Sequence, residues 1–373
     1  IGLEEFKTQA YLLECIAEIT EGKEFVEQRT WRTGILVFLK GSNPEKTIGW
    51  RTDIDGLPII EQTGLDFASR HEGRMHACGH DIHTSNLQTV AEILNRTKDQ
   101  WKGKVKLVFQ PAEENGGGGR EMIKAGLMDE IPDACFALHV ENGVPGKIVV
   151  GSRYLTAYSD SYKITVHGKA AHSSTPEEGV DAVYIAASIV TALHGIISRN
   201  ISPMDRATLN VGMIHGGTAP NIIADEVTLG VMLRNLSKES REAMMKKIET
   251  ISNGIAESMG GSCDLAFRAG YAAVYNDEKF SDFVAATFRK YEDIIHEDLG
   301  DGKPEDWLIT GEHPLLGAED FGFYSQKAPS CMIWVGVGGN SPKHSPGFCI
   351  DERYIKLCTR AMAMTALEYL TKE

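Results

Sequence analysis

The chain has 373 residues, of which 42% are apolar and 24% charged, so it has the composition of a globular protein and the length of two domains. The net charge of −14 argues against nucleic acid as a partner, because phosphates require a basic surface. We see no apolar run near the length of a membrane span, so no membrane partner is expected. The seven cysteines are scattered and odd in number, which favours a reducing, cytoplasmic location without a small disulfide framework.

The first predicted elements are a helix and two strands. Apolar residues at helical spacing predict a helix over residues 3–19, and short apolar runs predict strands over residues 34–39 and 47–51. Asp53 and Asp55 follow the second strand, and side chains two positions apart on an extended chain point the same way. Ligands in open α/β sheets bind at such strand ends, although a turn cap is the alternative. We favour a functional pair because a cluster of metal-ligand residues follows.

That cluster is Met75-His76-Ala77-Cys78-Gly79-His80-Asp81-Ile82-His83. Thiolate, imidazole and carboxylate groups bind borderline-soft divalent metals. Gly79 permits a tight turn, so that Cys78 and His80 can point at the same place. A helix is predicted from about residue 84 to residue 95, which puts the cluster in a loop that leads into a helix. A polar loop without metal is the alternative, and so many ligand groups close together disfavour it.

The next predicted strand, over residues 104–109, leads to the adjacent glutamates Glu113 and Glu114. Neighbouring residues on an extended backbone face opposite ways, so one carboxylate can bind a metal while the other takes a proton from water. Glycines at residues 116–119 let the backbone approach a ligand, although a flexible loop is the alternative. They lack the Lys-Ser/Thr ending of a phosphate loop, which disfavours nucleotide binding.

A short helix is then predicted over residues 120–125, and a strand over residues 134–138 leads to His139. A single histidine at a strand end is usually structural. Because earlier predicted strand ends also lead to ligand-type residues, we favour a place for His139 in the site.

The pattern changes near residue 151. Residues 152–270 show the order β-α-β-β-α-β of the ferredoxin-like arrangement. The predicted strands cover residues 158–167, 207–214, 226–234 and 263–268, and the predicted helices cover residues 180–197 and 238–259. One loop of this domain contains His172, a candidate hydrogen-bond donor to a substrate; an exposed structural histidine is equally supported by this segment alone.

After residue 270 the first domain resumes. The predicted elements are a helix over residues 278–296, an acidic loop over residues 301–317, a strand over residues 331–337 and a helix over residues 352–370. His344 lies in a loop between two prolines. The expected fold class is α/β, with residues 1–151 and 271–373 as a metal-binding catalytic domain and residues 152–270 as an inserted α+β domain.

Taken together, these motifs resemble those of the M20 metallopeptidase family, and within it the amidohydrolase branch that cleaves N-acyl amino acids. The resemblance spans nearly the whole chain in the family's order. Residues 76–81 and 110–114 carry most of its specificity. The other matching stretches are residues 53–58, 138–139, 172–174, 317–321 and 344–346.

The resemblance implies a zinc-peptidase-like catalytic domain with two divalent metal ions, zinc or manganese, with nickel or cobalt as alternatives. It also implies that the inserted ferredoxin-like domain is a lid that forms a homodimer. The implied metal ligands are Cys78, His80, Glu114, His139 and His344.

Further roles follow from the same resemblance. Glu113 would be the general base, and Asp55 or Asp53 would support the site, with Asp55 favoured by its spacing to Pro58. His172 would reach the substrate from the lid of the other subunit. As a separate hypothesis, Asn221 and Arg234 at strand ends of the lid hold the carboxylate of the amino acid.

The expected function is metal-dependent cleavage of small-molecule N-acyl-L-amino acids, with N-acetyl-diaminopimelate deacetylation as the alternative. Residues 43–49 and 197–205 are similar to bacterial N-acetyl-diaminopimelate deacetylases, whereas residues 317–320 and the region around His344 are similar to aminoacylases and hippurate hydrolases. Family members usually carry a short Arg- and His-containing helix before the segment that starts here, so we expect a preceding segment. A dipeptidase, a cysteine hydrolase with Cys78 as nucleophile and a non-catalytic binding protein are less favoured.

Overall fold

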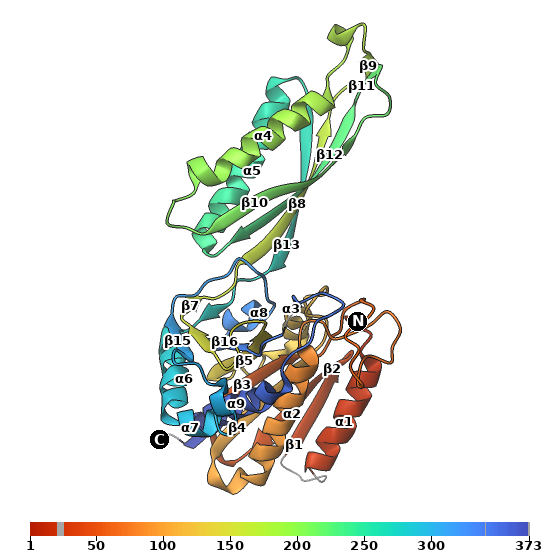
Figure 1. Cartoon of the computed structure of the whole chain (residues 1–373). Helices are drawn as coiled ribbons and strands as arrows, with labels where there is room; N and C mark the ends of the chain where they lie inside the picture. Colours follow the sequence, from red (N-terminus) through yellow and green to blue (C-terminus); the bar gives the residue numbers. More distant parts are fainter. Residues whose placement is uncertain (21–25, 340, 372–373) are drawn as a thin grey trace. The chain divides into compact units, whose positions relative to one another are not determined.

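The computed structural model describes residues 1–20, 26–339 and 341–371 (Figure 1). The chain divides into two compact units. Unit 1 comprises residues 1–155, 274–313 and 320–373, and unit 2 comprises residues 156–273 and 314–319.

Unit 1 contains an eight-stranded sheet whose central strands are parallel. These strands are β4 (Lys102–Gln110), β3 (Ser42–Asp53), β5 (Ala134–Glu141) and β16 (Ser330–Gly336). One edge is extended by antiparallel β2 (Gly34–Lys40) and β1 (Val26–Trp31), and the other by β6 (Ile148–Gly151) and β15 (Leu308–Gly311). The strand order is β1-β2-β4-β3-β5-β16-β6-β15. Carboxyl ends of the parallel strands therefore meet at one edge of the sheet.

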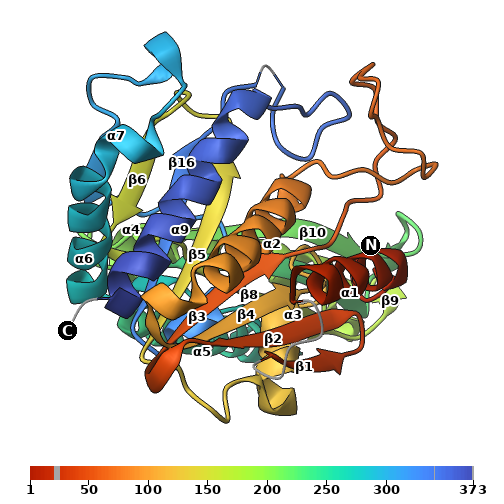
Figure 2. The ribbon, with the colours of Figure 1, turned by 90° about the horizontal axis from the view of Figure 1, so that it is seen from below.

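Helices cover both faces of this sheet, and alternate side chains of each strand enter different cores. In β2, Ile35, Val37 and Leu39 belong to one core and Leu36 and Phe38 to the other. The first core is covered by the helices α1 (Phe6–Thr20), α2 (His80–Arg96), α6 (Glu278–Lys290) and α9 (Ile355–Thr371), which Figure 2 shows on one side of the sheet. The second core is covered by α3 (Gly118–Met122) and α8 (Gly322–Ser325).

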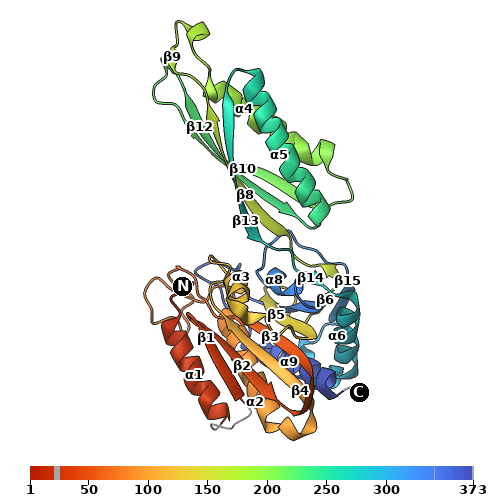
Figure 3. The same ribbon diagram turned by 180° about the vertical axis from the view of Figure 1, so that it is seen from behind.

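Unit 2 has a four-stranded antiparallel sheet in the order β10-β12-β8-β13. With its two helices it follows the β-α-β-β-α-β order of the ferredoxin-like arrangement. Figures 1 and 3 show both helices on one face of the sheet. The elements are β8 (Tyr158–His167), α4 (Ala182–Asn200), β10 (Ala207–Gly216), β12 (Glu226–Asn235), α5 (Lys238–Ser258) and β13 (Ser262–Tyr271). Its assignment as a lid and dimerisation domain stays a prediction.

Helix α4 corrects one sequence expectation. It has 19 residues and is long and apolar enough to cross a membrane, the single such helix in the described part of the chain, whereas we had seen no apolar run near that length. Ile185, Ile189 and Leu193 lie four positions apart on one face of α4, and that face is buried in the core of unit 2. Tyr184 and Ala187 on another face are exposed. This packing is that of a core helix.

Some elements begin or end at positions that the local sequence pattern did not predict. The helix predicted from about residue 84 begins at His80, because Gly79 adopts a left-handed conformation (φ 91°) at its N-cap. The helix predicted over residues 278–296 breaks at Tyr291 into α6 and α7 (Glu292–Ile295), and β15 lies inside the predicted acidic loop. Four short strands form two further pairs: β7 (Arg153–Tyr154) with β14 (Tyr275–Asn276), and β9 (Ala171–His172) with β11 (Ile222–Ile223).

Candidate metal centre

The carboxyl ends of three neighbouring strands place acidic and imidazole side chains close together in unit 1. In the sheet, β3 lies between β4 and β5. Asp53 at the end of β3 pairs with Gln110 at the end of β4, and His139 lies near the end of β5. Gly79 turns the chain directly before α2, so that His80 begins the helix beside these strand ends.

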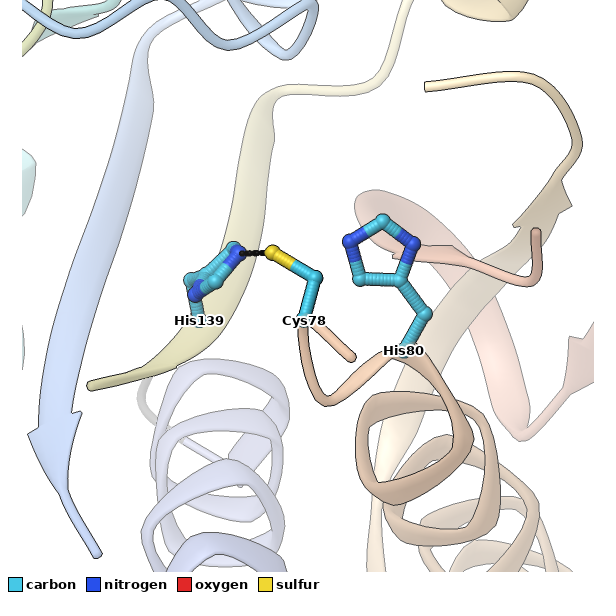
Figure 4. A group of neighbouring side chains, drawn as sticks. All are labelled: Cys78, His80 and His139. Carbon is cyan, nitrogen blue, oxygen red and sulfur yellow. Dashed lines mark hydrogen bonds between the residues drawn. The ribbon is translucent and has the colours of Figure 1, made fainter. Parts of the chain in front are cut away.

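Cys78, His80 and His139 form the first group of possible metal ligands, and one donor atom of each lies within 4.8 Å of the others (Figure 4). Cys78 Sγ is 3.5 Å from His139 Nε2. The other ring nitrogen of His139, Nδ1, lies 2.6 Å from the carbonyl oxygen of Val140 and therefore donates a proton to it. This hydrogen bond leaves Nε2 of His139 with its lone pair directed at the thiol.

His80 is oriented in a similar way by Asp55. Its Nδ1 lies 3.1 Å from both Asp55 Oδ1 and the Asp55 carbonyl oxygen, which are acceptors, so Nδ1 carries a proton. His80 Nε2 is buried and makes no hydrogen bond among the described residues. Burial alone would lower the pKa of His80, yet Asp53 and Asp55 hold that pKa well above its ordinary value. The surroundings thus favour a positive charge at Nε2, which a proton or a metal ion can supply.

Glu114 and His344 complete the predicted ligand set. Glu114 Oε1 lies 3.0 Å from His344 Nε2 and 3.9 Å from His80 Nε2. His344 is half exposed, and its backbone N–H donates to the carbonyl oxygen of Ala77, which ties its loop to the cysteine segment. The structure therefore brings all five residues into adjoining groups, together with Glu113, which is 7% exposed.

His83, the third histidine of the cluster, occupies a different position. Its Nε2 accepts the N–H of Val140 at 2.9 Å, so its Nδ1 donates to Asp53 Oδ1 at 2.6 Å. Both ring nitrogens are thereby used, and burial lowers the pKa of His83, which favours the neutral ring. We infer that His83 orients Asp53 instead of binding a metal.

A buried charge network beneath this group was missed from the sequence. Arg51 donates to Asp53 Oδ2 at 2.9 Å and to Asp320 Oδ1 at 2.6 Å, and all three side chains are buried. Gln110 Nε2 also donates to both oxygens of Asp320. Burial alone would raise the pKa of Asp53, but His80, His83 and Arg51 hold it well below its ordinary value. These partners favour the charged form of Asp53, which suits it to positioning more than to proton transfer.

The donor set fits a divalent metal. Imidazole, thiolate and carboxylate are the ligands of zinc and related ions, and the buried, unpartnered His80 Nε2 is the kind of atom that a metal satisfies. The alternative role of Cys78 as a nucleophile is disfavoured, because burial raises the pKa of its thiol to about 12 and a neutral thiol reacts slowly.

We predict that Gly79→Ala weakens metal binding at least about tenfold and costs about 1–3 kcal/mol of folding free energy. The residue has φ 91°, and a Cβ there would lie 2.3 Å from Val140 Cγ2, so the turn between Cys78 and His80 must shift. Metal content after dialysis and the melting temperature measure the two effects. Gly64→Ala is the matched control, because Gly64 also has positive φ (72°) but open space around it. A Gly79→Ala variant with the wild-type metal content would contradict this account.

Three predicted substrate-contact residues lie in unit 2. His172 on β9 is exposed and pairs with Ile222 on β11, next to Asn221, whose carbonyl oxygen accepts the N–H of Ser173. Arg234 lies on β12, and its chain neighbours Leu233 and Asn235, which point to the other face of the sheet, are buried. The Nη1 atom of Arg234 is buried and has no hydrogen bond among the described residues. Burial lowers the pKa of Arg234. A guanidinium nitrogen of this kind is suited to bind an anion.

The chain is similar to known proteins in both sequence and fold. Residues 49–368 match the model of peptidase family M20/M25/M40. An N-acetyldiaminopimelate deacetylase of Streptococcus thermophilus is 44% identical over 356 residues, which are 94% of this chain and 90% of that protein. A dinuclear metal-binding M20 peptidase from Bacillus subtilis superimposes with a TM-score of 0.84 at 27% identity, covering 100% of this chain and 94% of that one. A provisionally assigned aminohydrolase from methicillin-resistant Staphylococcus aureus has a TM-score of 0.89 at 33% identity, covering 99% and 92%.

An α/β fold with this donor set at its strand ends has the features of a metal-dependent enzyme. The chain belongs to peptidase family M20, and it is an enzyme of the amidohydrolase type within that family. This assignment confirms the resemblance seen in the sequence motifs.

Proposed function

We propose that the enzyme removes the acetyl group from N-acetyldiaminopimelate. The observation that carries this proposal is the 44% identity to a deacetylase of that name over 94% of the chain. This substrate is narrower than the N-acyl-L-amino acids that we expected first from the sequence, and it is the alternative that we stated there.

We propose that Cys78, His80, Glu114, His139 and His344 hold two divalent metal ions, zinc or manganese. When bound, such ions polarise the amide carbonyl and lower the pKa of a water molecule towards neutrality. The observation in support is the convergence of these donors around the unpartnered His80 Nε2. Asp55 is proposed to orient His80 through Nδ1, and Asp53 is proposed to support the site from beside His80, with its Oδ2 3.7 Å from His80 Nε2.

Glu113 is the proposed general base. It takes one proton from water, and the remaining hydroxide forms a bond to the carbonyl carbon of the acetyl group. Glu113 then gives this proton to the amide nitrogen as the C–N bond breaks, so that the products are acetate and the free amino acid. Its position beside Glu114 and His80 and its low exposure support this role.

His172 is the proposed donor to the oxyanion. Its Nδ1 lies 3.2 Å from the backbone N–H of Ser174, which can only donate, so Nε2 carries the proton in the neutral ring. A donor of this kind is worth about 3 kcal/mol in the transition state. Asn221 and Arg234 are proposed to hold a substrate carboxylate, and the unbonded Nη1 of Arg234 supports this assignment. We further propose a cytoplasmic homodimer formed by unit 2, in which His172 serves the partner's site.

The test is amine release from a panel of N-acetyldiaminopimelate, hippurate, N-acetylmethionine and a dipeptide. We expect cleavage that is strongest on N-acetyldiaminopimelate, stops when a chelator removes the metal and returns with zinc or manganese. Stronger cleavage of another panel member would reassign the substrate within the same chemistry. Turnover that persists after complete removal of metal would refute the metal mechanism.

A further inference from the structure

We propose that Glu5 is a positioning residue of the active site, because it holds the turn that presents Glu113 and Glu114. The inference rests on the proposed function, which makes Glu113 the base. Glu5 lies directly before α1, far in sequence from both glutamates, and it is only 4% exposed.

Both carboxylate oxygens of Glu5 are used in hydrogen bonds. Oε1 accepts the backbone N–H of Ala112 at 3.1 Å and that of Leu3 at 3.0 Å. Oε2 accepts the hydroxyl of Thr33 at 2.6 Å, and Thr33 is fully buried. Donors on both oxygens hold the carboxylate in one orientation, with one oxygen directed at the start of the glutamate turn.

Ala112 is the residue whose conformation needs this support. Its φ is 55°, a left-handed value that costs a residue with a Cβ roughly 1 kcal/mol or more. A charge-assisted hydrogen bond from its N–H to a buried carboxylate offsets that cost. The carbonyl oxygen of Ala112 in turn accepts the N–H groups of Gly116 and Gly118, which closes the turn around the two glutamates.

Two further carboxylates hold the same turn at later points. Asp55 Oδ2 accepts the N–H of Glu114 at 3.0 Å, and Asp320 Oδ2 accepts the N–H of Gly119 at 2.9 Å. Residues 112–119 are thus held at their start, middle and end by side chains from three separate segments. Asp55 also binds His80, and Asp320 also binds Arg51. Among the described residues, Glu5 makes no hydrogen bond to a proposed metal ligand. Glu114, the proposed ligand within the turn, keeps the hydrogen bond from its N–H to Asp55 when Glu5 is replaced.

The expected effect of Glu5→Ala is a fall in kcat of about 10- to 100-fold, because a displacement of about 1 Å in a catalytic group costs that much. KM and metal content should change less than about threefold. Glu5→Gln keeps an oxygen that can accept from Ala112, so it should restore most of the activity. Thr33→Val removes one donor to the carboxylate without a change of charge, and an intermediate kcat is expected.

The turn itself is measured by hydrogen exchange of residues 110–119 in the metal-loaded full chain. Exchange should be at least tenfold faster in Glu5→Ala than in wild type and close to wild type in Glu5→Gln. Glu4→Ala is the matched control: it removes the same charge from the same segment, but the Glu4 side chain is 61% exposed. Exchange and kcat of this control should be unchanged.

The outcomes separate this inference from the proposed function. Unchanged exchange in folded Glu5→Ala and Thr33→Val would overturn the inference, as would faster exchange with an unchanged kcat. If Glu5→Ala does not fold, the inference is tested with Thr33→Val and Glu5→Gln, by hydrogen exchange of residues 110–119 and by kcat. A wild-type enzyme inactive on the whole panel would refute the proposed function, while the exchange comparison would still test whether Glu5 holds the turn.

Discussion

Glu113→Gln is expected to lower kcat by about 1,000-fold or more while the bound metal remains. Glutamine has nearly the same shape as glutamate but cannot take a proton from water. Glu113 is almost fully buried beside Glu114 and His80, so solvent is poorly placed to replace it as the base.

Metal content by elemental analysis and single-turnover rates on the best panel substrate measure the two parts of this prediction. Glu121→Gln is the matched control, because Glu121 lies on α3 shortly after the same turn but is partly exposed and pairs with Lys124. We expect this control to turn over at the wild-type rate. Near-normal turnover of Glu113→Gln would rule out Glu113 as the base.

Arg51→Met is expected to lower the free energy of unfolding of unit 1 by about 3–5 kcal/mol, because removal of one partner leaves a buried charge uncompensated. Arg51 is 2% exposed and lies between Asp53 and Asp320, so the variant leaves two buried carboxylates without their cation. We also expect weaker metal binding, since Asp53 Oδ2 lies 3.7 Å from Nε2 of the proposed ligand His80.

Urea unfolding, monitored by tryptophan fluorescence, measures the loss in free energy of unfolding for unit 1 alone. All five tryptophans, at positions 31, 50, 101, 307 and 334, belong to that unit. Arg96→Met is the matched control, because Arg96 forms an exposed pair with Glu92 one helical turn away. Such a pair contributes at most about 0.5 kcal/mol. A loss in Arg51→Met no larger than that of the control would show that the network is not needed for stability.

Local patterns predicted most helices and strands because each pattern depends on near neighbours. A continuous apolar run marks β2, a period of two marks β8, and a period of 3.6 marks helices such as α5 and α9. The local pattern did not indicate β15, a strand of four residues in an acidic loop, or the break at Tyr291. Short strands of this kind are stabilised by pairing with a distant strand, as β15 is by β6.

The sequence also indicated which side chains gather at the metal centre. Cys78 and His80 are two positions apart, Glu113 and Glu114 are adjacent, and each pair lies near a predicted strand end or helix start, so local spacing carries the information. Their roles as ligands and base remain predictions, while membership of the M20 amidohydrolases is shown by the comparisons.

By itself, then, the sequence determined the α/β class, the family and the candidate ligand residues, because these depend on periodicity and on motifs a few residues long. Only the tertiary structure decided which nitrogen of His80 and His139 is left for a metal, since that depends on Asp55 and the backbone of Val140. It also decided that both nitrogens of His83 are used, by Asp53 and by the N–H of Val140. It also decided the partners of Arg51 and Glu5. Arg51 and Asp320 are 269 positions apart, and Glu5 and Ala112 are 107 apart. No local pattern encodes such pairs, because the tertiary packing of elements far apart in the sequence brings them together.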